Sequence, residues 1–106
     1  MHRQTASADV FRAIADPTRR AILARLRQGP APVNTLAAEF SQSRPAISKH
    51  LRILNEARVV SEQRAGRERI YRIEPAKLRE VDDWIGDYRG LWQGNLNRLK
   101  TYLEQK

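Results

Sequence analysis

The stretch "SRPAISKHLRIL" at residues 43–54 separates apolar from cationic residues in the way expected of a helix with two different faces. Its apolar residues recur at the i, i+4, i+7 spacing that puts side chains on one side of an α-helix: Ile47, Leu51 and Leu54. Its polar and cationic residues fall on the opposite side: Ser48, Lys49 and Arg52. The pattern predicts one face built for a core and a second, positively charged face.

The residues just before this helix predict a second, shorter helix joined to it by a turn. A short helix is expected over about residues 33–40, and the polar turn "SQS" at residues 41–43 follows it. Ser43 can accept a hydrogen bond from a first-turn amide of the next helix, and Pro45 fits that first turn. A short helix, a tight turn and a second helix with a cationic outer face form the helix-turn-helix pattern.

Two further helices are expected nearer the N-terminus. Ser7 or Asp9 can cap the first of them. Asp16 and Pro17 mark the start of the second, because aspartate accepts hydrogen bonds from first-turn amides and proline lacks an N–H that would otherwise stay unpaired. The sequence "GPAP" at residues 29–32 ends this second helix.

After residue 59 the apolar pattern changes to a period of two. Residues 60–64 and 69–73 alternate and are rich in β-branched and aromatic side chains, which favours two strands. Gly66 supplies a positive φ for a turn at residues 65–68, so we expect a β-hairpin. A helix-turn-helix followed at once by a basic hairpin is a winged helix.

A last helical region begins at Pro75, and its apolar residues step by three or four for about seven turns. Gly86, Gly90 and Gly94 leave open whether it is broken in that interval. We expect a single winged helix-turn-helix domain over residues 1–106, mainly α with a small β-hairpin. Residues 1–74 would form the winged-helix body and residues 75–106 a C-terminal dimerisation helix.

The apolar stripe of that last region is too long for a winged-helix body to cover, which favours a two-fold homodimer. The first helix is expected to assist. The predicted dimer contacts are Val10, Phe11, Leu78, Val81, Ile85, Tyr88, Trp92, Leu96, Leu99 and Leu103.

The charge balance points to a polyanionic partner. The 106 residues include 20 Lys and Arg against 12 Asp and Glu, for a net charge of +8. In a duplex complex, the first turns of the helix at residues 43–54 would enter the major groove, and wing arginines would reach phosphates or the minor groove. The predicted DNA-binding residues are Gln42, Ser43, Arg44, Pro45, Ser48, Lys49, Arg52, Arg64, Arg67 and Arg69.

These residues are expected to play different roles. Arg44 can pair with guanine in a bidentate contact, whereas Lys49 and Arg52 suit phosphates. Pro45 is either a helix starter or a contact to a thymine methyl group. Arg19 and Arg20 fit surface charge slightly better than phosphate contact.

Composition argues against several other classes of function. The chain has no cysteine, which removes disulfides and thiolate metal sites, and it has only two histidines. His50 lies beside the buried side of its helix and about 200° from Ser48, so the two do not form a nucleophile and base pair. Neither a signal peptide nor a membrane span is expected. We predict a soluble cytoplasmic protein that is not an enzyme and needs no cofactor, metal or membrane.

Five segments together resemble the ArsR/SmtB family of winged-helix transcriptional repressors: "ADPTRRAILARL", "TLAAEF", "SRPAISKHLRILNEARVV", "RAGRERIYRI" and "YRGLWQGNLNRLKTYLE". The resemblance implies a homodimer that binds an imperfect inverted repeat in its own promoter region. It also implies that the helix starting near Ser43 is the recognition helix and that the hairpin is the wing.

The chain differs from the metal-sensing members of that family. Those members carry a cysteine pair in the helix that here reads "VNTLAAEF", or paired Asp and His ligands in the last helix, and neither set is present. The chain is therefore more similar to the metal-independent branch. The alternative function is a non-catalytic winged-helix interaction module that docks protein or binds nucleic acid without sequence preference.

Overall fold

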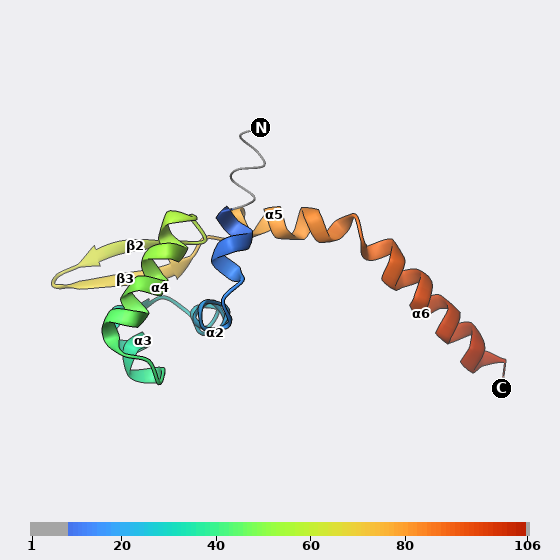
Figure 1. Cartoon of the computed structure of the whole chain (residues 1–106), viewed down its shortest axis with the longest axis horizontal. Helices are drawn as coiled ribbons and strands as arrows, with labels where there is room; N and C mark the ends of the chain where they lie inside the picture. The colour runs from blue at the N-terminus through green and yellow to red at the C-terminus, as the bar shows by residue number, and fades with distance from the viewer. Residues whose placement is uncertain (1–8, 106) are drawn as a thin grey trace.

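The computed structural model describes residues 9–105, so the proposed cap Ser7 lies outside the described residues. Residues 9–14 are helical, and the elements that follow form a helix-turn-helix, a wing and two C-terminal helices (Figure 1). In chain order they are α2 (Pro17–Leu26), β1 (Ala31–Pro32), α3 (Val33–Glu39), α4 (Arg44–Glu56), β2 (Val60–Ala65), β3 (Glu68–Ile73), α5 (Pro75–Gly86) and α6 (Arg89–Glu104).

Helix α2 begins where its cap predicts. The Asp16 side chain accepts hydrogen bonds from the backbone N–H groups of Thr18 at 2.8 Å and Arg19 at 3.1 Å, and Pro17 follows as the first helical residue. The hydrogen bond from the Arg19 amide lowers the pKa of the Asp16 carboxyl below its ordinary value of 3.8. The cap therefore favours the charged form of Asp16.

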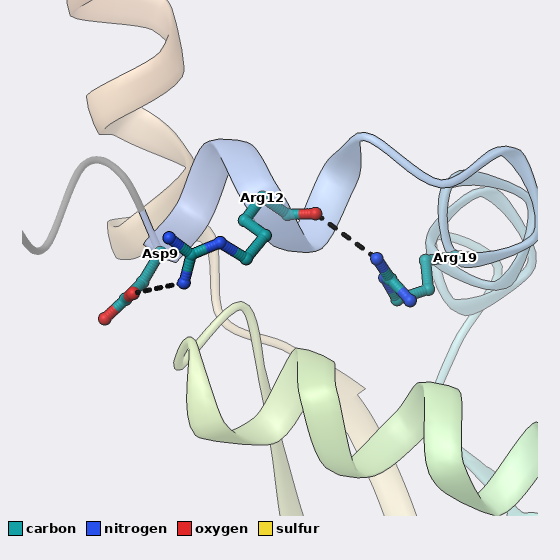
Figure 2. Close-up of polar contacts among 3 residues, drawn as sticks. All are labelled: Asp9, Arg12 and Arg19. Atoms are coloured by element: carbon teal, nitrogen blue, oxygen red, sulfur yellow. Dashed lines mark hydrogen bonds and ion pairs between the residues drawn. The ribbon is translucent and has the colours of Figure 1, made fainter.

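Two arginines join the first helix to α2, although the sequence suggested surface charge for both. Arg19 donates from Nε to the Ala13 carbonyl at 2.6 Å. Its Nη2 donates to the Arg12 carbonyl at 3.3 Å, the contact that Figure 2 shows. Arg20 donates from Nη1 to the Ile14 carbonyl at 3.0 Å and to the Ala15 carbonyl at 2.9 Å. Carbonyls at the end of a helix have no partner within it. The two guanidinium groups supply those partners, and this ties the first helix to α2.

The sheet has three antiparallel strands in the order β1-β3-β2, one more than the expected hairpin. The extra strand is the end of "GPAP": Ala31 pairs with Tyr71 and Pro32 with Ile70. Proline fits here because an edge strand does not need every N–H. The hairpin itself is as predicted, one residue longer in each strand, with Gly66 at φ 64° in its turn.

Helix α4 ends in a Schellman motif, in which the last carbonyls of the helix accept bonds from the residues that follow. The Val59 N–H bonds to the Leu54 carbonyl and the Arg58 N–H to the Asn55 carbonyl, each at 3.0 Å. Arg58 takes the left-handed position at φ 64°, which glycine usually occupies. This sharp end leads the chain directly from α4 into β2.

The core lies between α2, α3, α4 and the sheet. Its large side chains without exposed surface are Ile22, Leu36, Ile47, Leu51, Leu54, Val59 and Val60. The apolar face of α4 is therefore in the core, as its spacing predicts. In α2, Ile22, Leu23 and Leu26 are buried, whereas the neighbouring Ala21 is exposed.

The region expected to form the C-terminal dimerisation helix consists of two helices, so the break that the sequence left open occurs just after Gly86. Helix α5 ends at Gly86, and tight turns follow, with N–H bonds from Asp87 to the Trp84 carbonyl and from Tyr88 to the Ile85 carbonyl. Helix α6 projects away from the body (Figure 1). The radius of gyration is 18.0 Å, whereas a compact chain of this length would have roughly 13 Å.

No helix in residues 9–105 combines the length and apolar character that crossing a membrane requires.

Candidate nucleic-acid interface

The first turns of α4 present the polar face that the sequence predicts. The Ser43 hydroxyl accepts a hydrogen bond from the Ala46 N–H at 3.3 Å, and Pro45 lies in the first turn. Arg44, Pro45, Lys49 and Arg52 are exposed, and Ser48 is half-buried. Because Ile47, Leu51 and Leu54 anchor the other face in the core, these side chains are held on a fixed support.

A groove of about 360 Å³ separates α4 from the wing, and we call it the arginine groove. Helix α4 contributes Arg44, Ser48 and Arg52 to its lining, and the wing contributes Glu62 and Arg69. A smaller hollow of about 110 Å³ continues towards the hairpin tip and adds Asn34, Arg67 and Glu68. The tertiary structure thus brings together cations that are up to 25 residues apart in the sequence.

The register of the hairpin places two arginines directly opposite each other. Arg64 pairs with Arg69 and Glu62 with Tyr71, and strand alternation puts all four side chains on one face of the hairpin. Like charges directly opposite on a sheet destabilise it. A bound anion would offset this repulsion.

One carboxylate, that of Glu62, lines the arginine groove itself. The Tyr71 hydroxyl donates to Glu62 Oε2 at 2.9 Å, and Arg69 Nε lies 3.9 Å from Glu62 Oε1. Burial, and then the bond to Glu62, raise the pKa of the Tyr71 hydroxyl above its ordinary value of 10.0. Glu62 therefore lies between Tyr71 and Arg69 inside the arginine groove. The sequence analysis missed Glu62 and Asn34, because only the pairing of distant elements identifies them.

Not every predicted DNA-binding residue lines the groove. Lys49 and Arg64 are exposed outside it. Gln42 is half-buried, and its amide is committed to Thr18 at 2.7 Å and His50 at 3.2 Å. Its expected contact to DNA therefore stays a prediction, for a residue whose amide is already held by two internal hydrogen bonds. Arg44 stays on the surface, where its Nε donates to Asn34 Oδ1 at 2.7 Å.

The predicted dimer residues divide into three groups. Val10 is fully buried within the chain and offers no surface to a partner, which corrects that expectation. Phe11, Leu78, Val81 and Ile85 are half-buried. The others are exposed large side chains: Tyr88, Trp92, Leu96, Leu99 and Leu103.

Aromatic contacts connect the first helix to the C-terminal region. The Phe11 and Trp84 rings meet edge to face with centroids 5.4 Å apart, and Tyr88 lies 5.1 Å beyond Trp84. We name the row Trp92, Leu96, Leu99 and Leu103 the α6 stripe, because its four-three-four spacing follows one side of α6. Its members are 53–62% exposed.

Among residues 9–105, no three His, Cys, Asp or Glu side chains gather as a metal site would require.

Comparisons with known proteins agree with this geometry. A family profile described as "Bacterial regulatory protein, arsR family" matches residues 16–62. The chain is 40% identical over 77 residues to the transcriptional repressor SdpR of Bacillus subtilis, which covers 73% of this chain and 86% of that protein. It is 47% identical over 68 residues to the HTH-type transcriptional regulator Rv2034 of Mycobacterium tuberculosis, with 64% of each chain covered.

Solved structures show the same fold. An ArsR-like transcriptional regulator from Rhodococcus sp. RHA1 superposes with a TM-score of 0.75 at 31% identity, over 95% of each chain. A homodimeric winged helix-turn-helix DNA-binding domain from Mycobacterium bovis superposes with a TM-score of 0.68 at 26% identity, over 79% of this chain and 81% of that one.

Proposed function

The chain belongs to the ArsR family of bacterial regulatory proteins, and we propose that it is a homodimeric transcriptional repressor that binds an inverted-repeat operator. The arginine groove is the observation that carries the proposal. It joins the outer face of α4 to the wing, with three arginines against one glutamate. A protein-docking surface would not need this concentration of guanidinium groups, which suit phosphates and guanine edges.

In the DNA complex, the first turns of α4 enter the major groove with Arg44 and Ser48 facing base edges. Lys49 and Arg52 grip phosphates on either side. Arg64, Arg67 and Arg69 of the wing reach phosphates or the adjacent minor groove. Arg64, which lies opposite the cation Arg69, gains a phosphate as its counterion in this complex.

In this proposal, two copies of the chain form a homodimer. The α6 stripe is exposed along a helix that leaves the body, and exposed apolar patches of this kind mark protein interfaces. The Mycobacterium bovis domain is described as homodimeric. Two-fold pairing through α5 and α6 would place the two α4 helices on half-sites about 34–36 Å apart, one turn of DNA.

The remaining features of the proposal concern control. The repressor acts in the cytoplasm, where promoter DNA lies, and performs no catalysis. It releases DNA without a metal signal, and its own concentration sets its occupancy. An organic ligand acting through the aromatic side chains near Trp84 is the alternative means of control, although aromatic rows at helical spacing more often serve packing.

The test is selection of a randomised duplex pool by the purified protein, followed by sequencing. An enriched inverted repeat supports the proposal. Retention of the pool without enrichment, or no retention, would favour the interaction module instead. Arg79→Ala, which removes an exposed cation on α5 away from the arginine groove, is the matched control for charge removal within it.

A further inference from the structure

Four side chains form a chain of hydrogen bonds from the first helix to the turn before α4. Arg19, which holds the Arg12 carbonyl (Figure 2), also places Nη1 3.3 Å from His50 Nδ1. His50 Nε2 lies 3.2 Å from Gln42 Oε1, and Gln42 Nε2 donates to Thr18 Oγ1 at 2.7 Å. Gln42 stands two residues before α4 begins.

The donors and acceptors define the protonation state of this chain. A guanidinium group only donates, so His50 Nδ1 must accept from Arg19. His50 Nε2 then carries the single ring proton and donates to the Gln42 carbonyl oxygen. The Gln42 amide nitrogen is left to donate to Thr18, as its distance indicates. Only the neutral imidazole with its proton on Nε2 satisfies every contact.

We propose that His50 is a positioning residue for operator recognition, and this rests on the function proposed above. Through Gln42, His50 holds the turn from which Arg44 and Ser48 are presented to base edges. Through Arg19, it connects that turn to the first helix, whose Phe11 packs against the C-terminal region. His50 itself makes no DNA contact in this proposal.

Protonation of His50 opens the chain of contacts. A second ring proton leaves Nδ1 with no lone pair and sets two cations side by side. The charged groups nearby are Arg19 and Asp16 from α2 and its cap, with Asp9, Arg12 and Glu56 in the hollow that Arg19 also lines. Imidazole side chains commonly change charge between about pH 5 and 8. Lower pH should therefore weaken sequence recognition.

The added charge also attracts phosphates, which complicates a simple affinity measurement. That attraction is independent of sequence, so it raises binding to any duplex. The useful quantity is therefore the ratio of affinity for the selected operator to affinity for an unrelated duplex. Because both affinities respond to the added charge, the ratio isolates the positioning of α4.

The experiment compares full-length wild type, His50→Gln and His50→Leu by fluorescence anisotropy on both duplexes. Glutamine can accept from Arg19 and donate to Gln42 without titrating, whereas leucine can do neither. We expect the wild-type ratio to fall about tenfold from the higher to the lower of two pH values. His50→Gln should hold its ratio within about twofold, and His50→Leu should show the lowered ratio at both pH values.

Circular dichroism of His50→Leu shows whether that variant folds, and the comparison with His50→Gln decides the matter if it does not. Coincident pH profiles for wild type and His50→Gln would overturn the role of His50 while leaving operator binding intact. A wild-type ratio near one at both pH values would overturn the proposed function and this inference together.

Discussion

Helix α4 and helix α6 have similar apolar periodicity and opposite surroundings. Ile47, Leu51 and Leu54 on α4 have no exposed surface, whereas Leu96 and Leu99 on α6 are 62% and 53% exposed. Spacing by three and four residues therefore specifies which side of a helix is apolar and leaves open what covers that side. In the body, the cover comes from the same chain. On α6, we expect it to come from a second copy.

The largest effect should follow from charging the α6 stripe. Leu96→Asp should give a monomer whose operator affinity is lower by roughly 10²–10⁴, because both half-sites no longer bind as one unit. Sedimentation velocity and anisotropy measure the two properties. Asn97→Asp, which adds a similar charge outside the stripe, is the control. A monomeric Leu96→Asp protein that binds its operator tightly would remove the distinction between α4 and α6.

Truncation on either helix should sharpen the comparison. Leu51→Ala should lower the free energy of unfolding by about 2–5 kcal/mol through a cavity in the core. Its effect in urea denaturation should be the same at every protein concentration. Leu99→Ala should destabilise in a concentration-dependent way, because its lost contacts belong to association. Equal, concentration-independent losses in both variants would show that α6 packs within its own chain.

Within the body, Arg44→Ala tests the base-reading side of the arginine groove. We expect operator binding to weaken by about 1–3 kcal/mol, with relaxed preference at one base position. Repeated selection with the variant measures the preference. Arg44 also donates to Asn34, so Asn34→Ala serves as the control for loss of that bond alone.

Arg67→Ala tests the wing, where the expected change is smaller. Binding should weaken similarly on operator and unrelated duplexes, and the slope of log affinity against log salt should become shallower by about one. Titration at several salt concentrations gives the slope. If Arg44→Ala and Arg67→Ala lose specificity equally, α4 and the wing do not have separate roles.

The smallest effect is expected from metals and oxidants, which should not change DNA binding at all. Zn²⁺, Ni²⁺, Cd²⁺, arsenite and peroxide should leave the preformed DNA complex intact, because the chain has no cysteine and only two histidines. Anisotropy during each titration measures the change. A tenfold loss of affinity at micromolar metal, or roughly 1.4 kcal/mol of coupling, would contradict this expectation.

Local patterns in the sequence were sufficient for most of the fold. The Asp16 and Ser43 caps, the two faces of α4 and the turn at Gly66 depend on neighbours within a few residues, so they can be predicted from spacing and side-chain chemistry. The sequence also indicated the family, which the comparisons confirm. The strand β1 could not be predicted, because two residues have no period and only pairing with β3 makes them a strand.

Tertiary structure alone decided the contacts between distant segments. From the sequence, Arg19 is expected to be surface charge, His50 to lie beside the buried side of its helix and Gln42 to contact DNA. The packing of α2 against α4 brings the three side chains together. Glu62 enters the arginine groove only through its register opposite Tyr71. The periodicity of a sequence predicts the side of a helix or strand on which each side chain lies. The partner that it meets depends on where the other elements lie, and that is a property of the packed chain.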